Sequence, residues 1–330
     1  MANITDKYTA KVAVITCTSS EGVLLERAIK SVHQQTMSDF VHVLVNNGGD
    51  VKTVDEVVKK YRNLMKSRVH VVHHARPLNR SAVYNQAIKS ENTAYIAIHD
   101  DTASWHPDFL QATTGLLDSG EISGVLAPTD RIYETIADDS LQDYARQSWT
   151  SKLRAISLYD LCLDNLLPAV GFVYRRDAAA GIHYYADSLE AHADWDFGLR
   201  FMRAYCVELL DESRVLAFDH HVSPLPVSVR GSTFTYEGVP EGELSALSDK
   251  LLRDDMRQGG LGIGYMLSER QKQRRSERLE ATEQSDILGR LDELEELVQE
   301  RTDYKAKLKR LAKRTPGSRL TWSVVRKIVR

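Results

Sequence analysis

The chain has 330 residues, 42% of them hydrophobic, and a formal net charge of −3, which suits a soluble globular protein with a sizeable core. No apolar stretch approaches the roughly 20 residues of a membrane-spanning helix, and the first eleven residues lack an apolar signal-peptide core. The three widely spaced cysteines argue against a disulfide framework or a cysteine zinc site and fit a reducing compartment. We therefore expect a cytoplasmic protein.

Short apolar runs alternate with helical patterns over the first hundred residues. Buried strands are predicted over residues 12–15, 41–45, 69–72 and 95–98, and helices over residues 23–35, 51–64 and 81–88. This alternation predicts an α/β fold with a mostly parallel sheet and helices on both faces. Ligands of such sheets sit at the carboxyl ends of the strands, so the loops that follow the four strands should build one site.

The middle of the chain, from about residue 120 to residue 240, is less regular. It contains an apolar run over residues 171–174 that predicts a strand, a helical pattern that begins near Asp194, and the His-rich segment at residues 219–221. We interpret this part as the second half of the same domain, which gives one globular domain over residues 1–242.

The carboxyl-terminal part differs in composition. After a connecting segment over residues 243–267, residues 268–315 are rich in Glu, Arg, Lys, Gln and Leu, and Ile287, Leu291, Leu294 and Val298 follow the spacing of a coiled-coil seam. We expect this coiled-coil helix to form a homo-oligomer or to dock a partner enzyme.

Positive charge is concentrated at the end of the chain. Residues 301–330 contain eleven Lys and Arg and one acid, so they carry +10, and the other residues carry −13 of the total −3. Residues 316–330 place Trp322, Val325, Ile328 and Val329 among basic residues, a pattern typical of a helix in a membrane interface. We expect this amphipathic tail to bind an anionic membrane surface. Its apolar face favours lipid over nucleic acid, so no nucleic-acid partner is expected.

Two acids follow the fourth predicted strand, Asp100 and Asp101, with Thr102 after them. A buried carboxylate costs stability unless a partner compensates it, and Mg²⁺ is typically bound by one or two carboxylates plus substrate phosphates. Two acids after a strand are also typical of a turn and helix cap, so both interpretations stay open on these residues alone.

Several phrases in a fixed order surround the two acids. They are the strand over residues 12–18, Ser-Val-His-Gln-Gln-Thr over residues 31–36, Asn-Asn-Gly-Gly-Asp over residues 46–50, Arg80 and Asn85 spaced as Arg-x-x-x-x-Asn, and Trp-His-Pro-Asp-Phe-Leu over residues 105–110. In this order the phrases resemble the family 2 glycosyltransferases of the bacterial surface-polysaccharide type. The resemblance covers residues 10 to 235 approximately, two-thirds of the chain.

The resemblance implies a Rossmann-like GT-A fold, a nucleoside-diphosphate sugar donor and a Mg²⁺ or Mn²⁺ ion. The metal motif of the family is usually Asp-x-Asp, and Thr102 occupies the third position here. We therefore expect Asp100 and Asp101 to hold the metal, with Thr102 as a weaker alternative to Asp101. In the family a His after the catalytic helix sometimes completes the metal shell, and His221 is the candidate.

A second phrase, Ala-Asp-Trp-Asp over residues 193–196, resembles the Glu-Asp phrase of the family, whose Asp is the general base. Asp194 takes that position, with Ala193 in place of the Glu. Sugar hydroxyls are poor nucleophiles, and a general base contributes roughly 10²–10⁴-fold to the rate. Asp194 could instead be a helix cap, and Asp196 is the alternative base.

The same resemblance places the donor nucleotide across the first two strand ends. Thr16, Thr18 and Ser19 can offer backbone and hydroxyl contacts to the base, and Asn47 stands where the family uses an Asp against the base or ribose. Arg80 could pair with the diphosphate, because a guanidinium group matches phosphate geometry, or could form a surface salt bridge.

The implied reaction is a single inverting displacement that moves a sugar from the donor to a hydroxyl of a glycan or lipid-linked glycan in cell-surface polysaccharide synthesis. The enzyme would then work at the inner face of the cell membrane. One alternative is a sugar nucleotidyltransferase, although the loop over residues 16–22 lacks the basic, Gly-rich character of its phosphate loop. The other alternative is a non-catalytic scaffold built on the coiled coil.

Overall fold

The computed structural model describes residues 9–19, 22–65, 68–120, 122–137, 140–189, 192–222, 241–257, 259–260 and 262–273. The chain divides into two compact units, Met1–Ser268 and Glu269–Arg330. Of the predicted coiled coil, only residues 268–273 are described, and they are helical. The predicted tail over residues 316–330 lies outside the described residues. Within the part that the structure describes, no helix is long and apolar enough to cross a membrane.

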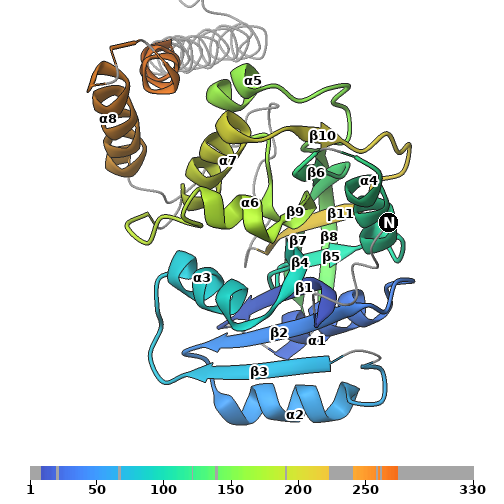
Figure 1. Ribbon diagram of the computed structural model, residues 1–330. Coiled ribbons are helices and arrows are strands. Elements are labelled where there is room, and N and C mark those ends of the chain that lie inside the picture. Colours follow the sequence, from blue (N-terminus) through green and yellow to red (C-terminus); the bar gives the residue numbers. More distant parts are fainter. Residues whose placement is uncertain are drawn as a thin grey trace, which may run out of the picture. The chain divides into compact units, whose positions relative to one another are not determined.

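The amino-terminal half of the first unit alternates strands and helices (Figure 1). Its strands are β1 (Ala10–Thr18), β2 (Phe40–Asn47), β3 (Arg68–His74) and β4 (Thr93–Ile98), and its helices are α1 (Gly22–His33), α2 (Val51–Tyr61) and α3 (Arg80–Ser90). β1 lies between β2 and β4, β3 lies outside β2, and all these pairs are parallel. The seven predicted elements are confirmed, with ends that differ by at most three residues.

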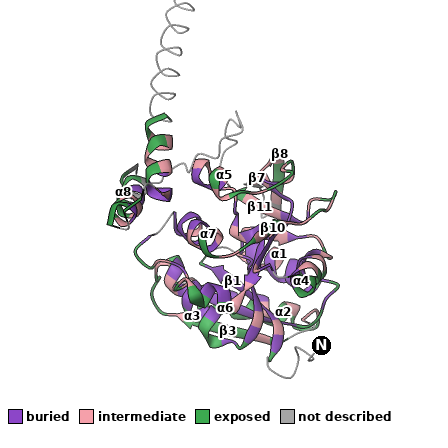
Figure 2. Cartoon of the chain, turned by 45° about the horizontal axis from the view of Figure 1, so that its top comes forward, coloured by how far each residue is buried: buried purple, intermediate pink, exposed green. Residues whose placement is uncertain are grey.

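The central strands are covered on both faces, which explains their continuous apolar sequences. Val12 and Val14 of β1 belong to one core cluster, whereas Ala13 and Ile15 belong to another on the opposite face. Figure 2 shows β1 as buried nearly throughout. Because both faces of the central strands are buried, the ends of the strands are the part of this sheet that can contact a ligand.

The complete sheet is mostly parallel, as predicted, but it is mixed because one of its described strands runs antiparallel to the others. Its order is β10-β6-β9-β4-β1-β2-β3, with β6 (Gly124–Leu126), β9 (Phe172–Arg175) and β10 (Val207–Leu209) beyond β4. The predicted strand near residues 171–174 is β9, and it runs antiparallel to both β4 and β6. The fold is therefore α/β with a mixed sheet flanked by helices, which is consistent with GT-A.

A second sheet was not predicted. It consists of β5 (Ala103–Trp105), β11 (Ala217–Val222), β7 (Thr129–Ala137) and β8 (Ser140–Ser148), in the order β5-β11-β7-β8. β11 pairs antiparallel with β5, so that Asp219 lies opposite Ala103. Residues near position 220 are thereby brought beside the loop that follows β4.

Further helices belong to the first unit. They are α4 (Phe109–Ser119), α5 (Leu158–Leu163), α6 (Arg176–Gly181), α7 (Ala193–Ala204) and α8 (Glu241–Arg257), with a 3-10 turn η2 (Ala169–Gly171) before β9. The helix predicted near Asp194 is confirmed as α7. α8 lies largely within the predicted connecting segment over residues 243–267, and its Leu247 packs with Leu189 and Ala193.

Candidate active site

The carboxyl ends of β1, β2 and β4 share one edge of the main sheet. Thr18 pairs with Asn46 across β1 and β2, and Ile15 pairs with Ile98 across β1 and β4. Beyond β4 the chain stays beside β1, because the Asp101 amide donates to the Cys17 carbonyl at 3.3 Å. The strand ends that were predicted to build one site are therefore neighbours.

Asp100 is held by α3 through one of its carboxylate oxygens. Its Oδ2 accepts a hydrogen bond from the Tyr84 hydroxyl at 2.6 Å and lies 3.2 Å from Arg80 Nη2. Arg80 and Tyr84 are four residues apart and so lie on the same face of α3. The other oxygen, Oδ1, is buried and has no hydrogen-bond partner among the described residues. Burial raises the pKa of Asp100, and the Arg80 charge opposes that rise.

The two residues after Asp100 are fastened to neighbouring strands. Asp101 is buried, and its Oδ2 accepts a hydrogen bond from the Thr18 hydroxyl at 2.6 Å. The Thr102 carbonyl accepts a hydrogen bond from the His220 amide at 2.8 Å. The loop that carries the two acids is thus fixed between β1 and β11.

Asp100 Oδ1 suits a divalent cation, because it is a buried carboxylate oxygen without a partner and hard cations take oxygen ligands. Among the described residues no group of three His, Cys, Asp or Glu side chains is arranged to hold a metal. His221 is exposed, and its ring packs on Tyr133 with 5.5 Å between the centroids. A cation here would need further oxygens, as Mg²⁺ sites that include substrate phosphates do.

Asp194 lies in the first turn of α7, where the N-cap is His192 and not Asp194. The interpretation of Asp194 as the cap residue is therefore wrong. Burial raises the pKa of Asp194 to about 6, the Arg80 charge lowers it, and the charges of Asp100 and Asp219 raise it. Its pKa therefore lies close to the range in which a carboxylate can accept a proton near neutral pH.

Asp196, the alternative base, is committed to an ion pair. It is 1% exposed, and its Oδ2 accepts hydrogen bonds from Arg200 Nε at 2.8 Å and Arg200 Nη2 at 2.5 Å. Arg200 also donates to the carbonyls of Ile182 and Tyr184. Asp196 therefore anchors the segment before α7, which favours Asp194 as the acid that is available to a substrate.

α3 connects the segments that carry the two acids. Asn85 Nδ2 donates to the Tyr185 carbonyl at 2.9 Å and to Asp187 Oδ1 at 2.8 Å, and its Oδ1 accepts from the Tyr185 amide. Asn79 caps α3 and donates to the Leu189 carbonyl at 3.1 Å. The Arg-x-x-x-x-Asn phrase thus has two tasks: Arg80 contacts Asp100, and Asn85 holds the segment that leads to α7.

The residues predicted to contact the nucleotide base differ in exposure. Thr16 has no exposed surface, and its hydroxyl is 2.8 Å from His42 Nε2. Thr18 is buried as well, and its hydroxyl is bonded to Asp101. Ser19 is exposed. The structure therefore places Thr16 and Thr18 beneath the strand edge and Ser19 at its surface, and their contacts with a base stay predictions.

Asn47 joins two loops at this edge. Its Nδ2 donates to the Leu78 carbonyl at 2.9 Å, and its Oδ1 accepts from the Leu78 amide at 2.8 Å. Gly48 follows with φ of 89°, and a Cβ there would lie 2.7 Å from Pro77. The turn therefore requires glycine at this position. The predicted contact between Asn47 and the nucleotide is not tested by these interactions.

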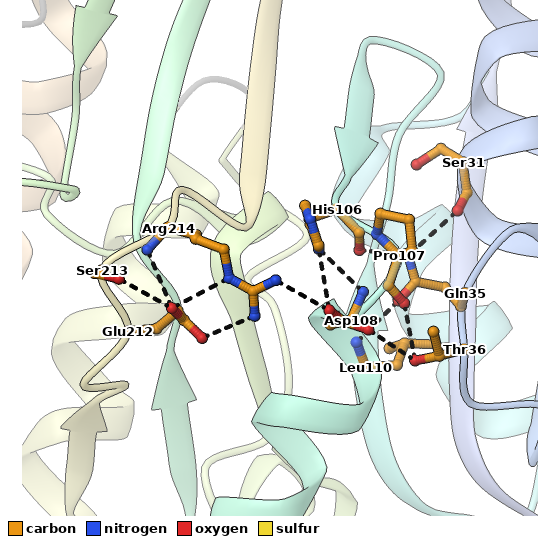
Figure 3. Close-up of polar contacts among 10 residues, drawn as sticks. All are labelled: Ser31, Gln35, Thr36, His106, Pro107, Asp108, Leu110, Glu212, Ser213 and Arg214. Carbon is orange, nitrogen blue, oxygen red and sulfur yellow. Dashed lines mark hydrogen bonds and ion pairs between the residues drawn. The ribbon is translucent and has the colours of Figure 1, made fainter.

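Two of the sequence phrases bind each other (Figure 3). Gln35 Oε1 accepts from the Leu110 amide at 2.9 Å, and Gln35 Nε2 donates to the His106 carbonyl at 2.9 Å. The Thr36 amide donates to the Pro107 carbonyl at 2.8 Å. These bonds tie the end of α1 to the segment that follows β5, only a few residues beyond Asp101.

The segment that follows β5 is also held by residues that precede β11. Arg214, in the turn before β11, donates from Nη1 to Asp108 Oδ2 at 3.1 Å and pairs with Glu212 at 3.0 Å (Figure 3). The loop with the two acids is thus followed by a stretch that is anchored to α1 and to the segment before β11. Sequence reasoning recognised the phrases but not that they are partners.

A buried charged cluster behind the acids was also missed. Glu134 Oε1 lies 2.6 Å from His220 Nδ1 and 2.7 Å from Arg27 Nη1, and His220 Nε2 lies 2.7 Å from Ser104 Oγ. Burial alone would raise the pKa of Glu134, but the hydrogen bonds from His220 and Arg27 lower it to about 2. The cluster joins α1, β5, β7 and β11. His221, the next residue of β11, faces the other side of the strand, because neighbouring side chains of a strand point to opposite faces.

The described geometry can be compared with known proteins. Residues 13–180 match the model of the family described as Glycosyl transferase family 2. A stretch of 95 residues is 33% identical to the uncharacterized glycosyltransferase MJ1057 of Methanocaldococcus jannaschii and covers 29% of this chain and 32% of that protein. The chain thus spans about a third of the curated relative that it matches.

Solved structures with a similar fold include the 1–349 fragment of S. aureus TarS. The similarity has a TM-score of 0.51 at 17% identity and covers 64% of this chain and 60% of that one. The same fragment in complex with UDP-GlcNAc gives a TM-score of 0.55 at 17% identity, with 73% and 66% of the two chains covered. In both comparisons the chain covers less than two thirds of the TarS fragment, and the similarity is one of fold.

Proposed function

We propose that this chain, which belongs to glycosyl transferase family 2, is a glycosyltransferase that moves a sugar from a nucleoside-diphosphate donor to an acceptor hydroxyl with inversion. One observation carries this proposal: Arg80 pairs with Asp100, and its charge also lowers the pKa of Asp194. A carboxylate suited to a metal and a carboxylate suited to proton transfer therefore lie around one guanidinium group. The nucleotidyltransferase and scaffold alternatives are not favoured.

The donor part of the proposal rests on the strand edge. TarS, which has a similar fold, was solved with UDP-GlcNAc bound. In the proposed complex the diphosphate of the donor lies beside Asp100, where Arg80 is half exposed and can turn its guanidinium group toward phosphate oxygens. Ser19 and Asn47 lie at the ends of β1 and β2, on the side where the nucleoside would extend.

Asp100 and Asp101 are the residues that we propose to hold Mg²⁺ or Mn²⁺. A bound cation would act as a Lewis acid that offsets charge on the leaving diphosphate. The unpartnered Oδ1 of Asp100 supports this assignment, because a buried carboxylate oxygen without a hydrogen bond is costly. Asp101 is fastened to Thr18 and would contribute from the neighbouring position.

Asp194 is the proposed general base. Its pKa of about 6 leaves most of the side chain ionised at pH 7 while keeping it a better proton acceptor than an ordinary Asp. Asp194 removes the acceptor proton as the acceptor oxygen forms a bond to the anomeric carbon. The bond between that carbon and the diphosphate oxygen breaks on the opposite face, and the diphosphate leaves with the electron pair.

The acceptor and the cellular setting are proposed from the sequence. We propose a glycan or lipid-linked glycan of a cell-surface polysaccharide, glycosylated at the inner face of the membrane. The basic, amphipathic pattern of residues 316–330 supports this setting, and the coiled-coil pattern of residues 268–315 supports a homo-oligomer or a partner enzyme. Both segments lie almost entirely outside the described residues.

The test begins with a thermal-shift screen of the full chain against UDP, GDP and a panel of nucleotide sugars, with and without Mn²⁺. We expect metal-dependent stabilisation by one donor class and slow metal-dependent hydrolysis of that donor. Asp100→Asn should lose both, and Asp194→Asn should keep the stabilisation but lose hydrolysis. A wild-type protein that neither binds nor hydrolyses any donor over a broad panel would overturn the proposal.

A further inference from the structure

We propose that Tyr84 is a positioning residue whose hydroxyl holds Asp100 Oδ2, so that Oδ1 stays available to the cation while Arg80 turns to the donor diphosphate. This inference rests on the proposed role of Asp100. Sequence reasoning singled out Arg80 and Asn85 within the same phrase and passed over Tyr84. The structure gives Tyr84 the shorter of the two contacts that α3 makes to Asp100.

The hydrogen bond from Tyr84 to Asp100 is short and buried. The oxygen atoms are 2.6 Å apart, and the Tyr84 side chain is 1% exposed. A hydroxyl that donates to a carboxylate makes one of the stronger kinds of hydrogen bond, and burial protects it from water.

The Tyr84 ring is fixed by packing. It meets the ring of Tyr185 edge to face, with 5.3 Å between the centroids, and Tyr185 stacks on Phe197 of α7 at 4.2 Å. The backbone of Tyr185 is in turn held by Asn85. A ring that is packed in this way has little rotational freedom, so its hydroxyl can hold a carboxylate at a set position.

Arg80 is more exposed than Tyr84, and its contact with Asp100 is longer. Half of its side chain is exposed, and its Nη2 lies 3.2 Å from the oxygen that Tyr84 holds at 2.6 Å. A half-exposed ion pair contributes little to stability, so its rearrangement costs little. Because Tyr84 keeps its bond, Arg80 can leave Asp100 for a phosphate without releasing the carboxylate.

The two oxygens of Asp100 then have separate tasks. Oδ2 has two donors on α3, whereas Oδ1 is buried without a hydrogen bond. Loss of the Tyr84 hydroxyl would let the carboxylate rotate and bring Oδ1 toward Arg80. The cation would then compete with a guanidinium group for the oxygen that it needs.

The experiment compares Tyr84→Phe with the matched variant Tyr185→Phe in the full-length protein. Both variants remove one buried hydroxyl from the same aromatic cluster, but the Tyr185 hydroxyl contacts Tyr174 at 3.4 Å and not Asp100. Free Mn²⁺ is measured by electron paramagnetic resonance during titration, in the presence of UDP or GDP, whichever stabilises the wild type more. All titrations are run well below the melting temperature of the least stable variant.

We expect Tyr84→Phe to weaken Mn²⁺ binding by about tenfold, as loss of a residue that orients a metal ligand typically does, and Tyr185→Phe to leave it unchanged. Arg80→Lys should weaken nucleoside-diphosphate binding more than Mn²⁺ binding. Wild-type affinity in Tyr84→Phe, together with loss of binding in Asp100→Asn, would overturn the role of Tyr84 and leave the proposed function standing. Absence of Mn²⁺ binding in the wild type would overturn both.

Discussion

Asp100 and Asp194 influence each other across Arg80. The pKa of Asp194 is raised to about 6, because burial and the negative charge of Asp100 raise it more than the charge of Arg80 lowers it. The protonation of the proposed base therefore depends on the charge of the carboxylate proposed to hold the metal. The pH dependence of the reaction can therefore be used to test the proposed role of Asp194.

The rate at limiting acceptor should fall below about pH 6, because Asp194 must be ionised to accept a proton. Asp219→Asn should shift this acid limb to lower pH, because the charge of Asp219 raises the pKa of Asp194. The measurement is kcat/KM for the acceptor between pH 4.5 and pH 8. An acid limb at the same pH in both proteins would contradict the assignment of Asp194 to that limb.

Asp194→Asn and Asp196→Asn should separate catalysis from stability. Asp194→Asn should lower kcat by roughly 10²–10⁴-fold with little change in melting temperature, because it removes the base. Asp196→Asn should instead lower the free energy of unfolding by about 2–3 kcal/mol, because it breaks the charged hydrogen bonds with Arg200. Urea unfolding and turnover at low temperature measure the two effects. The reverse pattern would make Asp196 the base.

Acid should destabilise the fold through buried histidines. Burial lowers the pKa of His99 to about 3, and it lowers that of His42 well below its usual value. The unfolded chain therefore binds more protons than the folded protein below about pH 6.5, so stability is fully present above that pH and falls as the pH drops. The loss should approach about 1.4 kcal/mol per pH unit for each histidine.

Urea unfolding of the wild type and of His99→Gln between pH 7.5 and pH 5 measures this loss. The variant should start with lower stability at pH 7.5, because His99 Nε2 lies 3.1 Å from Ser31 Oγ. Its stability should then decline less steeply with acid. Equal slopes for the two proteins would show that His99 does not bind a proton on unfolding in this range.

The carboxyl-terminal tail should bring the protein to membranes. The full chain should float with liposomes that contain anionic lipid, whereas a chain that ends near Gly317 should remain in the soluble fraction. Neutral liposomes and high salt provide the controls, since both weaken electrostatic attraction to the surface. Equal flotation of the two chains would remove the tail as a membrane-binding segment.

The first half of the fold was predictable because burial on both faces leaves a local signature. β1, β2 and β4 carry continuous apolar runs, and each is followed by polar residues at the same sheet edge. β8 has no such signature, since its sequence is Ser-Leu-Gln-Asp-Tyr-Ala-Arg-Gln-Ser and it pairs with β7 at the side of the second sheet. Its strand conformation depends on its partner more than on its own residues.

The candidate site could be predicted in part, for a different reason. Asp100, Asp101 and Asp194 were proposed from their places in ordered phrases, and Arg80 lies beside Asp100 as a result of how α3 docks. Tyr84 shares the face of α3 with Arg80, four residues further on, which was visible in the sequence. That this face points at the end of β4 is a property of tertiary packing that no local pattern contains.

The contacts of α3 also limit which changes of sequence can alter the candidate site. Its Arg80 and Tyr84 hold Asp100, while its Asn79 and Asn85 hold the segment that precedes Asp194. One helix thus sets the separation between the proposed metal ligand and the proposed base. Changes elsewhere in the chain that leave α3 in place would therefore leave the separation of the two carboxylates unaltered. Under the proposed function, the acceptor could thus change during evolution while the geometry of the two carboxylates stays the same.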